Sequence, residues 1–186
     1  MKPNYWFDVV VREPIYGVRR VLATLHAQCR QTGRPFSIDL PALRAGCGTA
    51  RRLGNIVRIF CDSREDADFF AKSLESDIRL RELARVRRVN ALDFNTHDGN
   101  WIVLRRLRVS KRREPKNRRR DIDLGQRLPF IMTRSKTNGH AYTLTFLRQA
   151  APKRRMDGDG HPNSYGLSGE HPVELPDLGY QLISQK

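Results

Sequence analysis

Residues 55–74 have the sequence NIVRIFCDSREDADFFAKSL and carry the two local signals that most constrain the fold. The first seven residues, Asn55 to Cys61, are rich in β-branched and aromatic side chains and predict a strand. Ser63-Arg-Glu-Asp66 follows as a capping box, whose serine and acidic side chains can satisfy the free N–H groups at the start of a helix. We therefore expect a strand that leads directly into a helix. The apolar stripe of this helix, at helical spacing, consists of Ala67, Phe69, Phe70, Leu74 and Ile78.

A similar pattern of strand, helix and strand precedes this segment. Tyr5–Val11 (YWFDVVV) predicts a strand, and Pro14 and Gly17 indicate a turn after it. Residues 18–31 are expected to form a helix, because their apolar side chains recur along one face. Residues 36–40 alternate apolar and polar side chains, which is typical of a short strand.

The segment from Val86 to Phe94 carries a weaker strand signal after the second helix. Together these elements have the order β-α-β-β-α-β, which is typical of a ferredoxin-like domain. We therefore expect an α+β protein whose first, ferredoxin-like domain spans residues 1–94.

The composition changes after Phe94, and we assign residues 95–186 to a second domain. Its expected elements are a strand at 101–109, a helix at 114–122 and two strands at 128–133 and 141–147. Pro115 is compatible with the helix because proline is tolerated in a first turn. The two later strands are separated by a polar turn and are expected to form a β-hairpin.

Positive charge is concentrated at the start of this second domain. The chain has a formal net charge of +15, from 35 basic and 20 acidic side chains. Ten of the 16 residues at 105–120 are Lys or Arg, and only Glu114 is acidic. These ten are Arg105, Arg106, Arg108, Lys111, Arg112, Arg113, Lys116, Arg118, Arg119 and Arg120. Such a segment is a docking surface for a polyanion, and its planar guanidinium groups suit phosphates and guanine edges.

Composition argues against several other classes of protein. The sequence has no apolar run of the length that a transmembrane helix needs, and the basic segment lacks the large apolar residues that would insert into a bilayer. Cys29, Cys47 and Cys61 are odd in number and widely spaced, so we expect reduced thiols in the cytoplasm. We expect no metal ligands and no cofactor.

The histidines are the candidates for acid–base chemistry, because imidazole titrates near neutral pH. His26 follows Leu25 on the apolar face of the first helix, and His140 ends the polar turn near Ser135. The other three lie in loops or in the tail. Composition alone favours none of the five, because most histidines are surface residues or hydrogen-bonded core residues.

Several short motifs have an order and spacing that point to one family. They are Leu25-His26, Leu40-Pro-Ala-Leu43, Arg52-Leu-Gly54, Arg58-Ile59, the basic segment, Arg134-Ser135 with its following glycine, and Tyr165-Gly-Leu-Ser168. Together they cover about residues 5–168. In this set the chain resembles the CRISPR-associated endoribonuclease of type I-F systems, which cuts precursor CRISPR RNA beside each repeat hairpin.

The resemblance implies a catalytic role for three residues. His26 matches the catalytic histidine of the family, Ser135 matches its catalytic serine, and Tyr165 matches the tyrosine that orients the active site. Tyr142 matches an aromatic residue that stacks on the last base pair of the RNA stem.

Arg106 and Arg108 match the two residues that contact the base of the stem, and Arg105 is an equal candidate. Well-known members have glutamine at the second position, which suits adenine, whereas Arg108 suits guanine. The further RNA-binding candidates in the basic segment are Arg112, Arg113, Lys116, Arg118, Arg119 and Arg120.

The implied reaction uses the RNA's own 2′-hydroxyl as the nucleophile, leaves a 2′,3′-cyclic phosphate and needs no metal. The general base would be His26, with Ser135 holding the ribose. The resemblance also implies that the enzyme keeps its product hairpin as a subunit of the RNA-guided surveillance complex, with the CRISPR RNA and the other subunits as partners and no role for a membrane.

Alternatives remain open for the function and for each residue. The chain could bind an RNA hairpin without cutting it, or could be a basic nucleic-acid-binding protein of another type. His140 is a rival base. Tyr142 and Tyr165 could be core residues, Ser135 could serve only the turn, and the basic segment could be a solvated arm.

Overall fold

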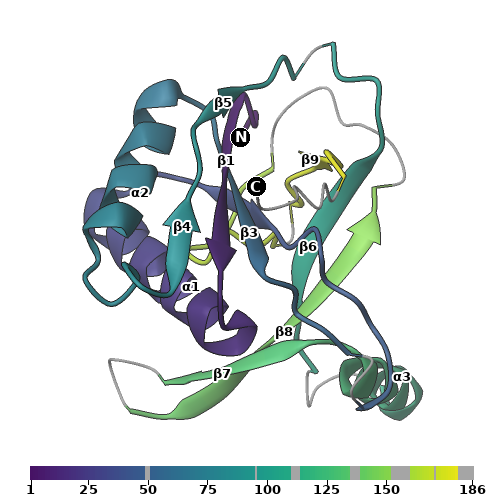
Figure 1. Cartoon of the computed structure of the whole chain (residues 1–186). Helices are drawn as coiled ribbons and strands as arrows, with labels where there is room; N and C mark the ends of the chain where they lie inside the picture. The colour runs from purple at the N-terminus through teal and green to yellow at the C-terminus, as the bar shows by residue number, and fades with distance from the viewer. Residues whose placement is uncertain are drawn as a thin grey trace.

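The computed structural model describes residues 1–48, 51–94, 96–109, 114–134, 139–151, 160–169 and 171–179. Over these residues the chain has a mixed α+β fold with two antiparallel sheets and three helices. Figure 1 shows the two sheets with α1 and α2 beside the first sheet and α3 beside the second. The candidate site residues come from both halves of the chain, so the contact between these halves decides the geometry of the site.

The first sheet is centred on β1, Tyr5–Val11, which has the bounds expected from the sequence. It pairs on one side with β3, Ile56–Cys61, and β3 pairs in turn with β2, Ser37–Asp39. On its other side β1 pairs with β4, Ala84–Val86, and with the two-residue strand β5, Asn90–Ala91. The strand order is β2-β3-β1-β4, and all pairs are antiparallel.

Helix α1, Pro14–Thr32, begins four residues before the expected start at Val18. The prediction of a turn at Pro14 is therefore wrong, because proline occupies the first helical position, where no backbone donor is required. Gly17 serves close packing, since a Cβ atom there would lie 2.6 Å from Cβ of Val11. Gly33 ends the helix in a left-handed conformation at φ 73°, which glycine adopts without steric cost.

Helix α2, Arg64–Ser76, begins at the predicted capping box. The hydroxyl of Ser63 accepts a hydrogen bond from the backbone N–H of Asp66 at 3.0 Å. The predicted apolar stripe is wrong at Ile78, which lies beyond the helix end and is 74% exposed. The helix stops earlier because Asp77 leaves the helical conformation and bonds to Arg20 and Thr24 of α1.

The strand expected at residues 86–94 is also different in the structure. Two short strands, β4 and β5, flank residues 87–89, which belong to no strand and include the buried Val89. Their hydrogen bonds go to different parts of β1. This segment therefore makes two short pairings with β1 instead of one continuous pairing.

The second sheet contains β6, Trp101–Leu107, and the hairpin formed by β7, Phe130–Arg134, and β8, Ala141–Ala150. Its order is β7-β8-β6-β9, where β9 is the short segment Leu175–Pro176 from the C-terminal part. In the hairpin, Thr133 lies opposite Tyr142. The expected hairpin is thus present, whereas no local pattern predicts β9.

Helix α3, Pro115–Arg127, extends beyond the expected end at Ile122. Pro115 lies in its first turn, as the sequence predicts. A Cβ atom at Gly125 would lie 3.5 Å from the side chain of Leu107, so the helix packs close to β6 at this point. None of the helices in the described ranges combines the length and the apolar composition needed to cross a bilayer.

A single hydrophobic cluster joins the two halves of the chain. It contains Leu25 of α1, Ile38 of β2, Phe146 of β8 and Leu167 near the C-terminal end, each at most 1% exposed. Burial of one such side chain contributes about 1.5–3 kcal/mol to stability. The core therefore extends across the expected domain boundary after residue 94, and it holds α1 against the second sheet.

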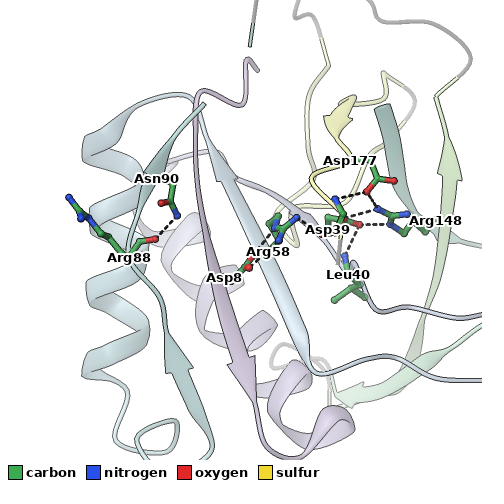
Figure 2. A network of polar contacts seen from close by, with 9 residues as sticks. Asp8, Asp39, Leu40, Arg58, Arg88, Asn90, Arg148 and Asp177 are labelled. Carbon is green, nitrogen blue, oxygen red and sulfur yellow. Dashed lines mark hydrogen bonds and ion pairs between the residues drawn. The ribbon is translucent and has the colours of Figure 1, made fainter. Parts of the chain in front are cut away.

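Two buried ion pairs lie on the side of the first sheet away from its helices. Asp8 of β1 and Arg58 of β3 form a two-point pair at 2.8 and 3.1 Å. Figure 2 shows a second set, in which Arg148 of β8 binds both Asp39 of β2 and Asp177 of the C-terminal segment. Asp39 is completely buried, so this pair connects the edge of the first sheet to the second sheet.

Candidate active site

The clearest feature of the site is a stack of two rings from distant parts of the chain. The ring centroids of His26 and Tyr165 lie 4.0 Å apart, and the ring planes differ by 1°. His26 lies on α1 next to the buried Leu25, whereas Tyr165 lies in a turn between β8 and β9. Packing of α1 against the second sheet therefore brings together two of the three expected catalytic residues.

The imidazole of His26 is oriented by a backbone carbonyl. Its Nδ1 atom lies 3.1 Å from the carbonyl oxygen of Ser164, the residue before Tyr165. A carbonyl oxygen only accepts hydrogen bonds, so Nδ1 carries the hydrogen in this contact. In the neutral ring Nε2 then keeps its lone pair. The ring is thus held on its face by Tyr165 and on its edge by Ser164, with Nε2 as the nitrogen able to take a proton.

Tyr165 is in turn connected to the β-hairpin. Its hydroxyl forms a hydrogen bond with the hydroxyl of Tyr142 on β8. Burial, together with this hydrogen bond, raises the pKa of Tyr165 far above that of an ordinary phenol. Tyr165 is therefore neutral at physiological pH and can orient or donate, but it cannot serve as a base. Both tyrosines also pack against the hydrophobic core.

Arg106 is the arginine of the basic segment that contacts this group. Its guanidinium carbon lies 5.3 Å from the ring centroid of Tyr142, and Nη2 donates to the carbonyl oxygen of Thr143 at 2.9 Å. Its Nε atom is buried and has no acceptor among the described residues. Burial and the neighbouring charge of Arg108 lower the pKa of Arg106, which means that its positive charge is poorly compensated.

The strand register distinguishes Arg106 from Arg105. Arg106 lies opposite the buried Phe146, whereas Arg105 lies opposite Leu147. Because successive side chains of a strand point to opposite faces, Arg106 shares the face of Tyr142 and Arg105 shares the face covered by α3. Arg105 and Arg106 were equal candidates in the sequence, but only Arg106 lies beside Tyr142.

A second surface lies on the opposite face of the second sheet. Helix α3 and β8 border an open groove with a volume of about 850 Å³. Four of its lining side chains are basic and one, Asp123, is acidic. The lining residues are Pro115, Lys116, Arg119, Arg120, Asp123, Leu124, Arg127, Leu147 and Gln149. Arg118 also lies on α3 and is exposed, but it does not line the groove.

Several expected site residues lie elsewhere or cannot be placed. Ser135, Arg112 and Arg113 lie outside the described residues; Ser135 directly follows Arg134, the last residue of β7. The rival base His140 is exposed just before β8 begins. Within the described ranges, no three His, Cys, Asp or Glu side chains are grouped so that they could hold a metal ion.

Asn163 is a site residue that the motif comparison missed. Its side-chain oxygen accepts hydrogen bonds from the backbone N–H groups of Tyr165 and Leu167, at 2.8 and 3.4 Å. An asparagine two residues before a turn residue is typical of an Asx turn, so the segment Asn163-Ser-Tyr-Gly166 did carry a local signal.

No protein-family model matches this chain, and no curated protein matches it in sequence.

Proposed function

We propose that this protein is a metal-independent endoribonuclease that cleaves CRISPR repeat RNA at the base of its hairpin. It then keeps the product hairpin as a subunit of a type I-F RNA-guided surveillance complex in the cytoplasm. The observation that carries this proposal is the orientation of His26, which Tyr165 holds by stacking while the Ser164 carbonyl engages Nδ1. A histidine held in this way offers one defined nitrogen, Nε2, to a substrate.

The chemistry follows from this orientation. Nε2 of His26 takes the proton of the ribose 2′-hydroxyl as the 2′-oxygen attacks the adjacent phosphorus. The bond from phosphorus to the 5′-oxygen breaks, the leaving 5′-oxygen takes a proton from water, and a 2′,3′-cyclic phosphate remains. A general base of this kind contributes ~10²–10⁴ to the rate. In this proposal Ser135, which follows the last residue of β7, holds the ribose, and neutral Tyr165 keeps the imidazole in place.

The strand order supports the fold implied by the family resemblance. An antiparallel β2-β3-β1-β4 sheet built from the element order β-α-β-β-α-β is the arrangement expected of a ferredoxin-like domain. Fold alone does not define an activity, so the weight of the proposal rests on His26 and its neighbours.

Arg106 and Tyr142 are the proposed contacts with the end of the RNA stem. Arg106 already lies against Tyr142, and its half-buried, poorly compensated charge suits an anionic or guanine-bearing ligand. Arg108 is exposed and follows β6 directly, so it can reach the same base pair. Tyr142 keeps its ring next to the stem end, while its hydroxyl is engaged by Tyr165.

Helix α3 supplies the proposed phosphate contacts along the stem. Lys116, Arg118, Arg119 and Arg120 are all exposed on this helix. The major groove of A-form RNA is narrow, but it opens near a helix end, where a basic helix can face phosphates on both walls. Because α3 and Tyr142 lie on opposite faces of the second sheet, the RNA would lie across the end of β6, where Arg108 begins the connection to α3.

A cleavage assay in excess chelator tests the proposal. The protein is incubated with the repeat RNA of its own host and with a shuffled RNA of equal length. Cutting at one position, with a cyclic phosphate on the product, supports the nuclease. Retention of the hairpin without cutting supports a non-cleaving RNA-binding subunit, and equal binding of both RNAs supports a general basic RNA-binding protein.

A further inference from the structure

The turn that carries Tyr165 is organised by the side chain of Asn163. Its Oδ1 atom accepts hydrogen bonds from the N–H groups of Tyr165 at 2.8 Å and Leu167 at 3.4 Å. The backbone of Asn163 closes the same turn, because its N–H donates to Leu167 and its carbonyl accepts from Gly166. One side chain thus satisfies two donors of a five-residue turn.

This turn delivers two adjacent groups to His26. The carbonyl of Ser164 accepts from Nδ1, and the ring of the next residue, Tyr165, stacks on the imidazole. Both contacts depend on the backbone direction between Ser164 and Tyr165. The hydrogen bond from the Tyr165 N–H to Asn163 fixes the peptide group whose other end is the Ser164 carbonyl, so a rotation of this peptide would break both bonds together.

The other end of the turn is anchored to the body of the protein. The carbonyl of Gly166 accepts from the N–H of Ile38 at 2.9 Å, and the N–H of Ser168 donates to Leu104 at 2.9 Å. Gly166 has a φ of +71°, and a Cβ atom there would lie 2.5 Å from the ring of Phe36. These anchors hold the turn at Gly166 and Ser168. The peptide between Ser164 and Tyr165 lies at the other end of the turn, where the side chain of Asn163 holds it.

We propose that Asn163 is a positioning residue that selects the tautomer of His26 with hydrogen on Nδ1. It does so through the peptide group between Ser164 and Tyr165, and it thereby leaves Nε2 free to accept a proton. The role of Nε2 as the base rests on the proposed function, whereas the choice of tautomer does not. Neutral histidine in water mostly carries its hydrogen on Nε2, so the opposite tautomer requires a fixed acceptor at Nδ1.

The tautomer is measured directly by two-bond proton–nitrogen correlation NMR of the protein without RNA. Spectra are recorded at about pH 8, where imidazoles are mostly neutral, and His26 is assigned by its loss in His26→Gln. Wild type is expected to show hydrogen on Nδ1, and Asn163→Ala is expected to shift His26 towards hydrogen on Nε2. Asn163→Asp keeps the acceptor oxygen and is expected to retain the wild-type pattern.

Two further variants separate this role from a general loss of structure. Asn90→Ala removes an asparagine side chain from β5 and is expected to leave the His26 signals unchanged. Asn163→Ser, whose hydroxyl closes such turns more weakly, provides an intermediate case if Asn163→Ala does not fold. Hydrogen on Nε2 in folded wild type, or unchanged hydrogen on Nδ1 in folded Asn163→Ala and Asn163→Ser, would overturn the proposal.

Cleavage of the repeat RNA supplies the second measurement. Asn163→Ala is expected to lower the single-turnover rate by at least ~10-fold at saturating RNA, with unchanged affinity for the hairpin, and Asn163→Asp is expected to restore the rate. A variant that loses affinity instead of rate would contradict the positioning role. If wild type does not cut at all, the proposed nuclease fails, while the NMR result still decides whether Asn163 sets the tautomer.

Discussion

The hydroxyls of Tyr142 and Tyr165 share a hydrogen bond that joins the β7–β8 hairpin to the turn stacked on His26. In the proposed enzyme Tyr142 contacts the end of the RNA stem, and Tyr165 holds the general base, His26. The bond therefore provides a direct physical link between the residue proposed to contact the stem end and the residue that stacks on the proposed general base, His26.

Removal of either hydroxyl should cost about the same free energy. Tyr142→Phe and Tyr165→Phe are each expected to lower the free energy of unfolding by about 1 kcal/mol, because each leaves the partner hydroxyl without its bond. The double variant should lose little more than either single one, so a double-mutant cycle in urea should give a coupling of about 1 kcal/mol. Additive losses would mean that the two hydroxyls act independently.

Arg106 and Arg105 should contribute unequally to RNA binding at the stem end. Arg106→Lys keeps the charge but loses the planar fork, and it should weaken binding of the repeat hairpin by about 1–3 kcal/mol. Arg105→Lys is the matched control on the other face of β6, and it should change the affinity by less than about 0.5 kcal/mol. Filter-binding titrations at one fixed salt concentration compare the two. Equal effects would contradict the assignment based on strand register.

The ion pair between Asp39 and Arg148 should be a major contributor to stability. Arg148→Met would leave the carboxylate of Asp39 completely buried without its cation, at an expected cost of about 3–5 kcal/mol. Asp177→Asn removes the more exposed partner of Arg148 and should cost at most about 1 kcal/mol. Urea denaturation measures both. A loss below about 1 kcal/mol for Arg148→Met would show that Asp39 is adequately solvated or neutral.

The pair of Asp77 with Arg20 should make stability depend on acid pH. Burial tends to raise the pKa of Asp77, but hydrogen bonds from Arg20 and Thr24 outweigh it and lower the pKa below its ordinary value. The folded state thus favours the charged carboxylate, and the stabilisation is present above a pH of about 3.9 and is lost as the pH falls through the folded-state pKa.

Arg20→Met should therefore lower the free energy of unfolding by about 1 kcal/mol or less at pH 7. The difference from wild type should shrink as the pH is lowered below about 3.9, which urea titrations at several pH values can follow. A difference that stays constant down to acid pH would assign the effect to packing instead of charge.

Local signals in the sequence predict most elements, whereas features that depend on contacts between distant segments are not predictable from it. The bounds of β1 and the helix N-cap at Ser63 follow from residue types within one short window, and both are confirmed. By contrast, β9 consists of Leu175 and Pro176, whose strand conformation depends on pairing with β6. The early start of α1 was missed because Pro14 suits a turn and a first helical position equally well.

The site was predictable only in part for the same reason. The sequence motifs predict His26 and Tyr165, and the structure brings their rings together. The choice between Arg105 and Arg106 required the register of β6 against β8, which no local pattern defines. The orientation of His26 depends on a backbone carbonyl, and every residue has one, so the residue type at Ser164 does not predict this contact.

The central claim is that Nε2 of His26 removes the proton from a ribose 2′-hydroxyl. Its most direct test is the single-turnover rate of repeat-RNA cleavage by His26→Gln and wild type in excess chelator, with hairpin affinity measured in parallel. The account predicts that the variant loses at least ~10²-fold in rate while its affinity stays within about threefold of wild type. Cleavage at the wild-type rate by folded His26→Gln would contradict it.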